Sequence, residues 1–343
     1  MAPGNRPTGD GRNVGTSRFS PGFRRGRNSE LAAPADDLAS EADDEATPAD
    51  GATTPSGVPI RPDLGPPAAG AQPVDQPGSG MGLLVAIFAS AVVLVLAIYA
   101  TGQPRPNRIP ILQTTNALFW IVGVLVIIGS GVGAQVAEKL AARGSGVARR
   151  SPDALPTAWI VPTVATAAAV LLVATFHNAV MIAVGPVVAF LGNAGALLAR
   201  DLLDDSGDSA RRAAITVHAF VVHFVAFLAL SAVYLNKLPT PVGVVLVGLI
   251  GGLLTLESLE RGNAPRERRV LYAIVGGFVL AQAIIPLNWW LTHGWTGGAI
   301  LLVVFYLAAG ILLAATQRAL RMRDLVEFGL VSALCFVALV FTA

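Results

Sequence analysis

Hydrophobic positions divide the chain into two unequal parts at Met81. Large apolar side chains are rare before this residue. After it, long apolar stretches alternate with short polar segments up to Ala343. A helix needs about 20 residues to cross a bilayer, and lipid offers its backbone groups no hydrogen-bond partners. The pattern therefore predicts an all-α fold in which residues 81–343 form a polytopic integral membrane helical bundle.

We predict about nine transmembrane helices, with a margin of one. The margin arises because only His177 and Asn178 interrupt the apolar run between the third and fourth stretches. This run is twice as long as one crossing, so a tight hairpin is the simplest interpretation. The predicted spans lie near residues 81–101, 114–136, 157–176, 179–199, 213–235, 240–256, 270–290, 296–316 and 325–342.

Residues 1–80 have the composition of a disordered arm. Arginines gather in the first 27 residues, acidic residues follow between Asp36 and Asp50, and residues 51–80 are rich in Pro and Gly. Such a segment buries too little apolar surface to offset the entropy of ordering. We predict a cytoplasmic arm with a basic tip, an acidic run and a Pro/Gly-rich tether.

The overall composition excludes several classes of protein. Charged residues make up 13% of the chain, whereas soluble proteins carry about 25%. The single cysteine, Cys335, excludes an intramolecular disulfide, and the four scattered histidines leave little material for a metal site. We predict no metal, no cofactor and no nucleic-acid partner. The strong preference for Arg over Lys, with abundant Ala, Gly and Pro, indicates a bacterial origin with high GC content.

The distribution of positive charge predicts the orientation in the membrane. With the N-terminus in the cytoplasm, 21 of the 24 Lys and Arg residues lie on the inner side of the nine spans. Cytoplasmic segments of membrane proteins carry such an excess. The predicted location is the bacterial plasma membrane, with the N-terminus cytoplasmic and the C-terminus outside.

Two pairs of similar segments suggest an internal repeat. The second and sixth spans close with Glu138 and Glu257, which are 119 residues apart, and Ala-Leu-x-x-Arg-Asp-Leu occurs at 196–202 and 319–325. These offsets suggest one additional span followed by two four-span halves in the same orientation, as some transporters have. Chance similarity between apolar segments is the alternative.

Few ionisable side chains are predicted to lie deep in the membrane. Glu138, Glu257, Glu260 and Glu327 lie close to cytoplasmic helix ends, where water or basic residues can reach them. We therefore expect helix-end residues and no buried charge pair.

Four polar residues form a candidate intramembrane site. His223 lies about 16 Å along its helix from Arg212, near the bilayer midplane. It is a candidate proton relay, or else a neutral histidine bonded to a neighbouring helix. His218 lies five residues earlier and does not share its face as a metal pair would. Asn193 and Gln282 are candidate interhelical hydrogen-bonding residues.

Four aspartates after the fourth span form a candidate acidic loop. On a helix, Asp201, Asp204, Asp205 and Asp208 would share one face, and carboxylates there suit Mg²⁺ bound to a diphosphate. The Asn-Asp-x-x-Asp-x-x-x-Asp pattern of intramembrane prenyltransferases is absent. A solvated loop is therefore the alternative that we favour.

Three functions fit these patterns. The first is a non-enzymatic membrane anchor or scaffold that contacts the lipid bilayer and recruits a protein partner through residues 1–80. The second is a transporter or permease for a small or lipophilic solute. The third is a Mg-dependent lipid- or isoprenoid-modifying enzyme. Transporters often carry a buried charge pair, and the absence of a predicted one favours the first function over the second. The missing prenyltransferase pattern argues against an enzyme, and nothing indicates the oligomeric state.

Overall fold

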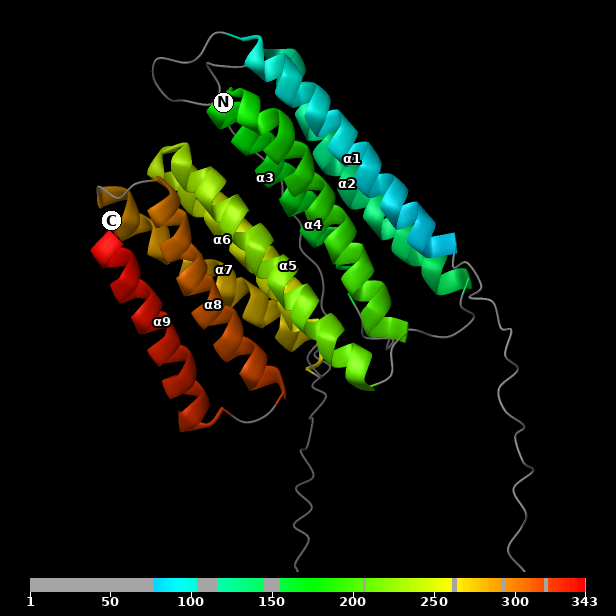
Figure 1. The fold of residues 1–343 in the computed structure, drawn as a ribbon. Helices are drawn as coiled ribbons and strands as arrows, with labels where there is room; N and C mark the ends of the chain where they lie inside the picture. The colour runs from blue at the N-terminus through cyan, green and yellow to red at the C-terminus, as the bar shows by residue number, and fades with distance from the viewer. Residues whose placement is uncertain are drawn as a thin grey trace, which may run out of the picture. The chain divides into compact units, whose positions relative to one another are not determined.

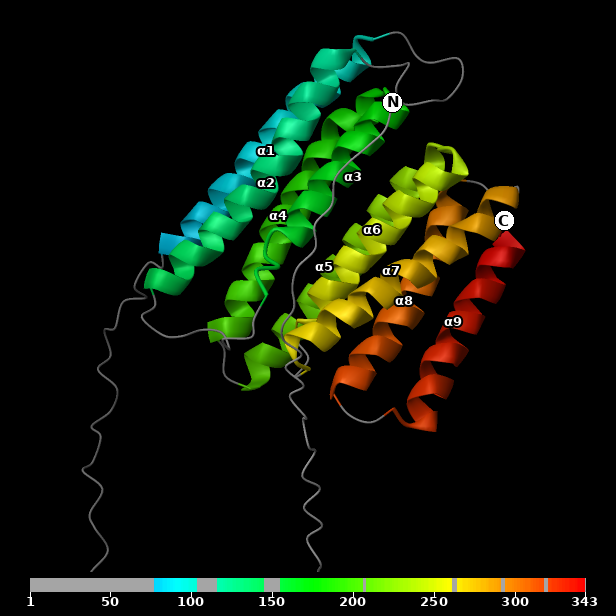
Figure 2. The same cartoon turned by 180° about the vertical axis from the view of Figure 1, so that it is seen from behind.

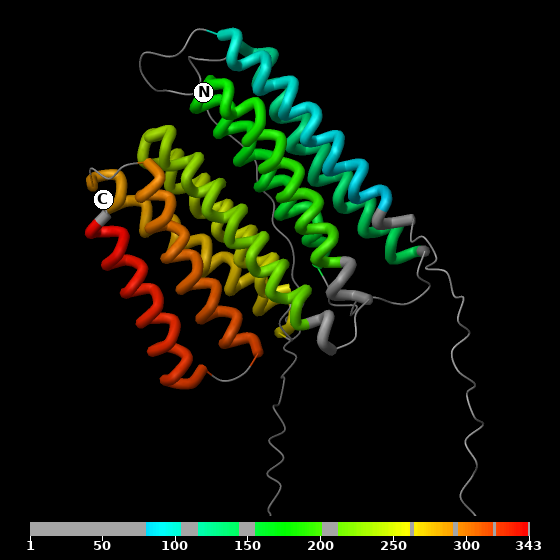
Figure 3. The backbone as a smooth tube through the Cα atoms, in the orientation of Figure 1, coloured from blue at the N-terminus to red at the C-terminus, as the bar shows by residue number. Residues whose placement is uncertain are grey.

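The computed structural model describes residues 77–103, 116–144, 155–205, 208–260, 264–290, 294–317 and 320–342 (Figure 1). Figure 3 traces the chain in the same orientation as a tube through the Cα atoms. Within these ranges the regular elements are all α-helices, and they follow one another in an up-and-down order (Figure 1). They are α1 (Pro77–Thr101), α2 (Ala117–Gly144), α3 (Ile160–Phe176), α4 (Ala179–Asp205), α5 (Asp208–Leu235), α6 (Thr240–Leu259), α7 (Arg266–Trp289), α8 (Gly294–Gln317) and α9 (Met322–Thr342).

The predicted helical membrane bundle is confirmed. Eight of the nine described helices are long and apolar enough to cross a membrane. The exception is α3, whose 17 residues reach about 26 Å. The expected hairpin around His177 and Asn178 is also present, because α3 ends at Phe176 and α4 begins at Ala179. The predicted arm lies outside the described residues, apart from its last four positions, which belong to α1.

The short helix α3 lies at the centre of the bundle. Twelve of its residues are buried, and it contacts α1, α2, α4, α5 and α6. Its threonines connect it to neighbouring segments: the amide of Asn193 in α4 donates to Thr166, and that of Asn236, just after α5, donates to Thr175. Lipid cannot satisfy these polar groups, so their pairing fixes how the neighbours pack on α3.

Eight of the described helices, α3 among them, form two groups of four. In the first group, α1 contacts α2 and α4, and α3 contacts α2 and α4. In the second, α5 contacts α6 and α8, and α7 contacts α6 and α8. The groups meet where α5 packs on α3 and α4, and where α6 packs on α3. The ninth helix, α9, packs mainly on α8; Figure 2 and Figure 1 show it at the opposite edge from α1.

This division differs from the predicted repeat in one respect. The offsets that relate α2 to α6 and α4 to α8 also relate α1–α4 to α5–α8. Within α1–α4, each helix contacts at least two others of the same group, and the same holds within α5–α8. The sequence pattern instead suggested that the additional span came first, before two four-span halves. By contact, the additional helix is α9.

Glycines allow two helix pairs to approach closely. A Cβ on Gly277 of α7 would lie 2.5 Å from the carbonyl oxygen of Gly248 in α6, and one on Gly298 of α8 would collide with Ser231 of α5. Small residues at helix interfaces have this role in membranes. Gly129 and Gly133 also have the small-residue spacing, but only Gly133 is packed, against Val85; the space beside Gly129 is open.

Candidate functional site

Charged side chains gather at the end of the bundle where α2, α4 and α6 end and where α5 and α7 begin. The helices extend past the predicted apolar spans here: α2 reaches Gly144 rather than residue 136, and α7 begins at Arg266 rather than at residue 270. These extra turns bring polar residues from five helices and from the segment before α3 together. We call this set the Arg200 cluster; its members are Glu138, Thr157, Arg200, His218, Glu257, Glu260 and Arg269.

Arg200 in α4 is the centre of the cluster. Its Nε donates to Oε1 of Glu257 at 3.1 Å, and a second guanidinium nitrogen donates to Oε2 of the same carboxylate. Another nitrogen donates to Glu138 of α2 at 3.1 Å, and Thr157 accepts at 2.8 Å. The planar guanidinium presents five donors, so it can hold a carboxylate with two bonds and still bind other acceptors.

The pair formed by Arg200 and Glu257 is buried. Arg200 is 7% exposed and Glu257 is 2% exposed. Removing two charges from water is unfavourable unless they are paired and their remaining hydrogen-bonding groups are satisfied. Thr157 accepts from a nitrogen that also binds Glu257, and Glu138 accepts from the third guanidinium nitrogen. The pair also connects the two groups of helices, because Arg200 belongs to α4 and Glu257 to α6.

His218 of α5 contacts the same carboxylate. Its Nε2 lies 3.2 Å from Oε1 of Glu257, and the side chain is 2% exposed. A carboxylate only accepts hydrogen bonds, so Nε2 carries the proton in this contact. The other ring nitrogen, Nδ1, is buried and has no hydrogen-bond partner among the described residues. His218 is the one histidine of the cluster.

Glu260 extends the cluster to α7 and to the segment that precedes α3. It accepts a hydrogen bond from the backbone N–H of Leu155 at 3.1 Å and pairs with Arg269 of α7 at 2.7 Å. Gln135 donates to Glu138 at 2.9 Å on the other side of the cluster. The network therefore connects α2, α4, α5, α6, α7 and the segment that precedes α3.

The prediction that the bundle has no buried charge pair is wrong. Glu138, Glu257 and Glu260 do lie near helix ends, but their side chains turn inward to Arg200 and Arg269 instead of extending to water. Hydropathy locates a residue along its helix and does not show which face it occupies. Glu327 differs from the others, because it is exposed on α9.

The four predicted intramembrane polar residues do not converge. The Nδ1 of His223 donates to the carbonyl oxygen of Ala219 in its own helix at 2.7 Å, and its ring contacts Phe305 and Tyr306 of α8. Asn193 is buried against α3, and Gln282 is exposed on α7. In the described part of the chain, no hydrogen bond joins any two of His218, His223, Asn193 and Gln282. Only His218 belongs to the Arg200 cluster.

The candidate acidic loop is divided between two helices. Asp201, Asp204 and Asp205 belong to the end of α4, and Asp208 is the first residue of α5. Their side chains lie outside the described residues, as do positions 206 and 207. Elsewhere, the described residues contain no group of three or more His, Cys, Asp or Glu arranged to hold a metal ion.

Comparison with known proteins places most of the chain in one family. The sequence model of the family described as "Protein of unknown function (DUF5656)" matches residues 105–342. The chain belongs to this family. No curated protein and no solved structure matches it. The DUF5656 match includes α2 to α9 and therefore every member of the Arg200 cluster. The eight long apolar helices among its described residues make this DUF5656 member a multi-pass membrane protein.

Proposed function

We propose that this protein transports a small solute across the membrane and that the Arg200 cluster is the part that changes state. The observation that carries the proposal is the buried ion pair between Arg200 of α4 and Glu257 of α6, with His218 beside it. Ionisable groups inside membrane bundles are unfavourable and typically mark ion pathways or proton relays. Here the pair lies where two groups of helices meet.

The pattern of the two groups supports this proposal. Glu138 of α2 and Glu257 of α6 occupy corresponding places in segments 119 residues apart, and both bind Arg200. Transporters built from repeats have their sites near the interface of the repeats and work by moving one repeat against the other. An ion pair across this interface would hold one arrangement and would have to break before the other forms.

A proton on His218 provides a way to break the pair. The imidazolium would place a second positive charge beside Glu257 and compete with Arg200 for this carboxylate. The other charged groups of the cluster are Glu138 of α2, Glu260 directly after α6 and Arg269 of α7. We therefore propose that transport is coupled to protons.

The alternatives from the sequence have less support. The anchor or scaffold function was favoured because no buried charge pair was expected, and the structure contradicts this premise. The arm through which it would recruit a protein partner lies outside the described residues. The enzyme hypothesis depends on aspartate side chains that also lie outside them. Both remain predictions.

A flux assay tests the proposal. The purified protein is reconstituted into vesicles that contain a pH-sensitive dye, and a panel of carboxylates, amino acids, amines, sugars, nucleosides and lipophilic cations is added outside. We expect one of these classes to produce a change in internal pH that protein-free vesicles lack.

Two variants assign that flux to the cluster. Glu257→Gln removes the charge that holds Arg200 and should abolish proton-coupled flux, whereas Glu327→Gln changes an exposed glutamate of α9 and should leave it unchanged. If no class of solute moves with the wild-type protein, the transport proposal fails. If Glu257→Gln transports as well as the wild type, the role of the cluster fails.

A further inference from the structure

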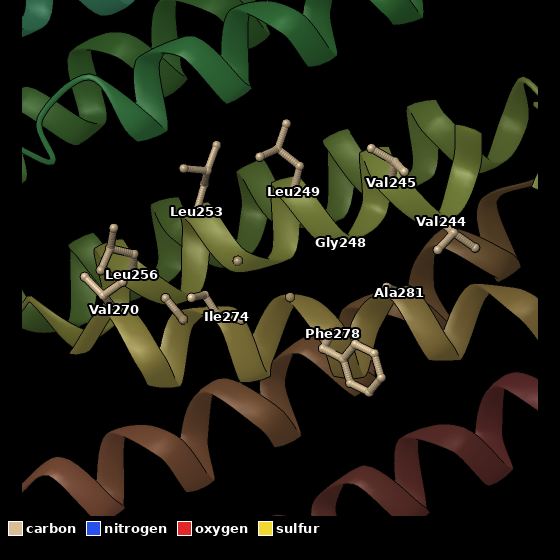
Figure 4. Close-up of a pocket in the computed structure, with 13 residues that line it drawn as sticks. Val244, Val245, Gly248, Leu249, Leu253, Leu256, Val270, Ile274, Phe278 and Ala281 are labelled. Atoms are coloured by element: carbon tan, nitrogen blue, oxygen red, sulfur yellow. The ribbon is translucent and has the colours of Figure 1, made fainter. Parts of the chain in front are cut away.

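An apolar groove runs along α6 and α7 (Figure 4). One end of it, at Leu256 and Val270, adjoins the Arg200 cluster, because Glu257 and Arg269 are the neighbouring residues in the two helices. Its volume is about 490 Å³. Gly248, Gly252 and Gly277 form part of its lining, because the two helices approach closely there and leave no side chains between them. Leu249 and Ile274 border it and are more than half exposed. The groove is thus open toward the surroundings of the bundle, which for these helices is lipid.

The length of the groove suits one hydrocarbon chain. Its lining on α6 extends from Val244 to Leu256, which is about 18 Å along a helix. One leaflet of a bilayer core is about 15 Å thick, half of its total of about 30 Å. Every lining residue is apolar or glycine. The groove therefore follows roughly one leaflet, from the helix ends near Leu256 and Val270 toward the middle of the membrane.

A basic residue lies at the helix end where the groove begins. Arg266 is the first residue of α7, is exposed, and precedes the lining residue Val270 by four positions, so the two share a helix face. The neighbouring acidic residues do not lie on this helix face. Glu267 follows Arg266 by one residue, so its side chain points about 100° away around the helix axis, and Glu260 is paired with Arg269. An anionic group at the membrane surface would meet Arg266 directly above the groove.

We propose that this groove binds an anionic phospholipid, with one acyl chain along α6 and α7 and the phosphate at Arg266. The inference is independent of the transport proposal. The apolar lining selects the chain, and the arginine selects the charge of the headgroup. A second copy of the protein would instead have to fill the narrow space beside the glycines with side chains.

Photo-crosslinking in vesicles tests this site on the full-length protein. Phosphatidylglycerol and phosphatidylcholine that carry a photoreactive group on one acyl chain are added in trace amounts, and labelled peptides are mapped. We expect phosphatidylglycerol to label peptides containing 244–256 and 270–281 about fivefold more than phosphatidylcholine does, which is the factor that about 1 kcal/mol per arginine implies. Arg266→Gln should remove this difference, and Arg323→Gln, at the exposed start of α9, should not.

Two further experiments identify the molecule that binds in the groove. Ile274→Trp fills the groove from its exposed border and should abolish labelling there, whereas Val124→Trp on the exposed face of α2 should have no effect. Glycerol phosphate, which has the headgroup without the chains, should fail to compete. The proposal is overturned if both lipids label equally, if Ile274→Trp leaves labelling intact, if glycerol phosphate competes, or if the label joins two copies of the chain.

Discussion

Arg200 binds three acceptor side chains, from α2, from α6 and from the segment before α3. Glu257 accepts from Nε and from one terminal nitrogen, Thr157 accepts from that same terminal nitrogen, and Glu138 accepts from the other. Removing any of these partners therefore leaves a guanidinium N–H without its acceptor. A lysine would keep the charge but lose the two-bond geometry. The loss in the free energy of unfolding should therefore depend strongly on which partner is substituted. It should also depend on whether both charges of the pair are removed together.

A double-mutant cycle measures this dependence. Arg200→Met leaves Glu257 buried without its partner and should lower the free energy of unfolding by about 3–5 kcal/mol. Adding Glu257→Leu should recover much of this loss, because no lone charge then remains in the pair. Thermal unfolding of the three variants in detergent checks the prediction. Additive effects of the two substitutions would show that the residues are not coupled.

His177 should make stability depend on pH. It lies between α3 and α4 in the left-handed region, with φ of 31°, and burial lowers the pKa of its imidazole below the usual value. The unfolded chain then binds the proton more readily than the folded one. The contribution of His177 to stability is complete above the unfolded pKa of about 6.5 and is lost as the pH falls below it.

The variant His177→Asn tests this effect, because asparagine tolerates the left-handed region and does not titrate. The unfolding temperature of the wild type should fall between about pH 8 and pH 5, and the variant should lose less over this range. Equal losses in the two proteins would contradict the assignment to His177.

At the residue scale, the sequence predicted single polar residues better than their partners. Asn193 was expected to bond across helices, and it donates to Thr166 of α3. Glu257 was assigned to a helix end because it directly follows an apolar stretch, and its partnership with Arg200 across 57 positions has no local signal. One available signal was the correspondence of Glu138 and Glu257 in the repeated segments, which placed two carboxylates at the same level of the bundle.

At the scale of helices, the apolar stretches predicted the number and order of the helices. They did not predict the polar turns at the helix ends. The fourth span was predicted to end at residue 199, and α4 continues to Asp205; the fifth was predicted from residue 213, and α5 begins at Asp208. Hydropathy falls where charges begin, but a helix continues as long as its backbone bonds form and its side chains find partners. Most charged members of the Arg200 cluster lie in or next to these added or terminal turns, whereas His218 lies further inside α5.

The contact between α6 and α7 should depend on glycine. Gly277→Ala places a Cβ 2.5 Å from the carbonyl oxygen of Gly248, so the helices must separate, and we expect a loss of about 1–3 kcal/mol. Gly129→Ala is the matched control, because nothing lies within 4 Å of its Cβ and alanine favours the helix by about 1 kcal/mol. Thermal unfolding compares the two. A Gly277→Ala variant as stable as the control would refute the close approach.

At the scale of the whole molecule, the distribution of charge predicts the orientation. The segments at the end of the bundle that carries the Arg200 cluster hold the Lys and Arg excess, so this end should face the cytoplasm. In a Cys335→Ser background, single cysteines at Arg323 and at Asn116 should behave differently toward an impermeant thiol reagent added to intact cells. Only the second should react. If only the cysteine at position 323 reacted, the orientation would be the opposite of the one predicted.

The division into α1–α4 and α5–α8 gives the account its central claim, that the ion pair between Arg200 and Glu257 holds the two groups together. Spin labels at Leu140 of α2 and Leu271 of α7, both exposed and near the cluster, report the distance between the groups. Pulsed dipolar spectroscopy in nanodiscs should give one narrow distance distribution for the otherwise wild-type protein with Cys335→Ser. Adding Glu257→Gln should produce a second, longer distance, and Glu327→Gln should not. If Glu257→Gln leaves the distribution unchanged, the pair does not hold the groups together.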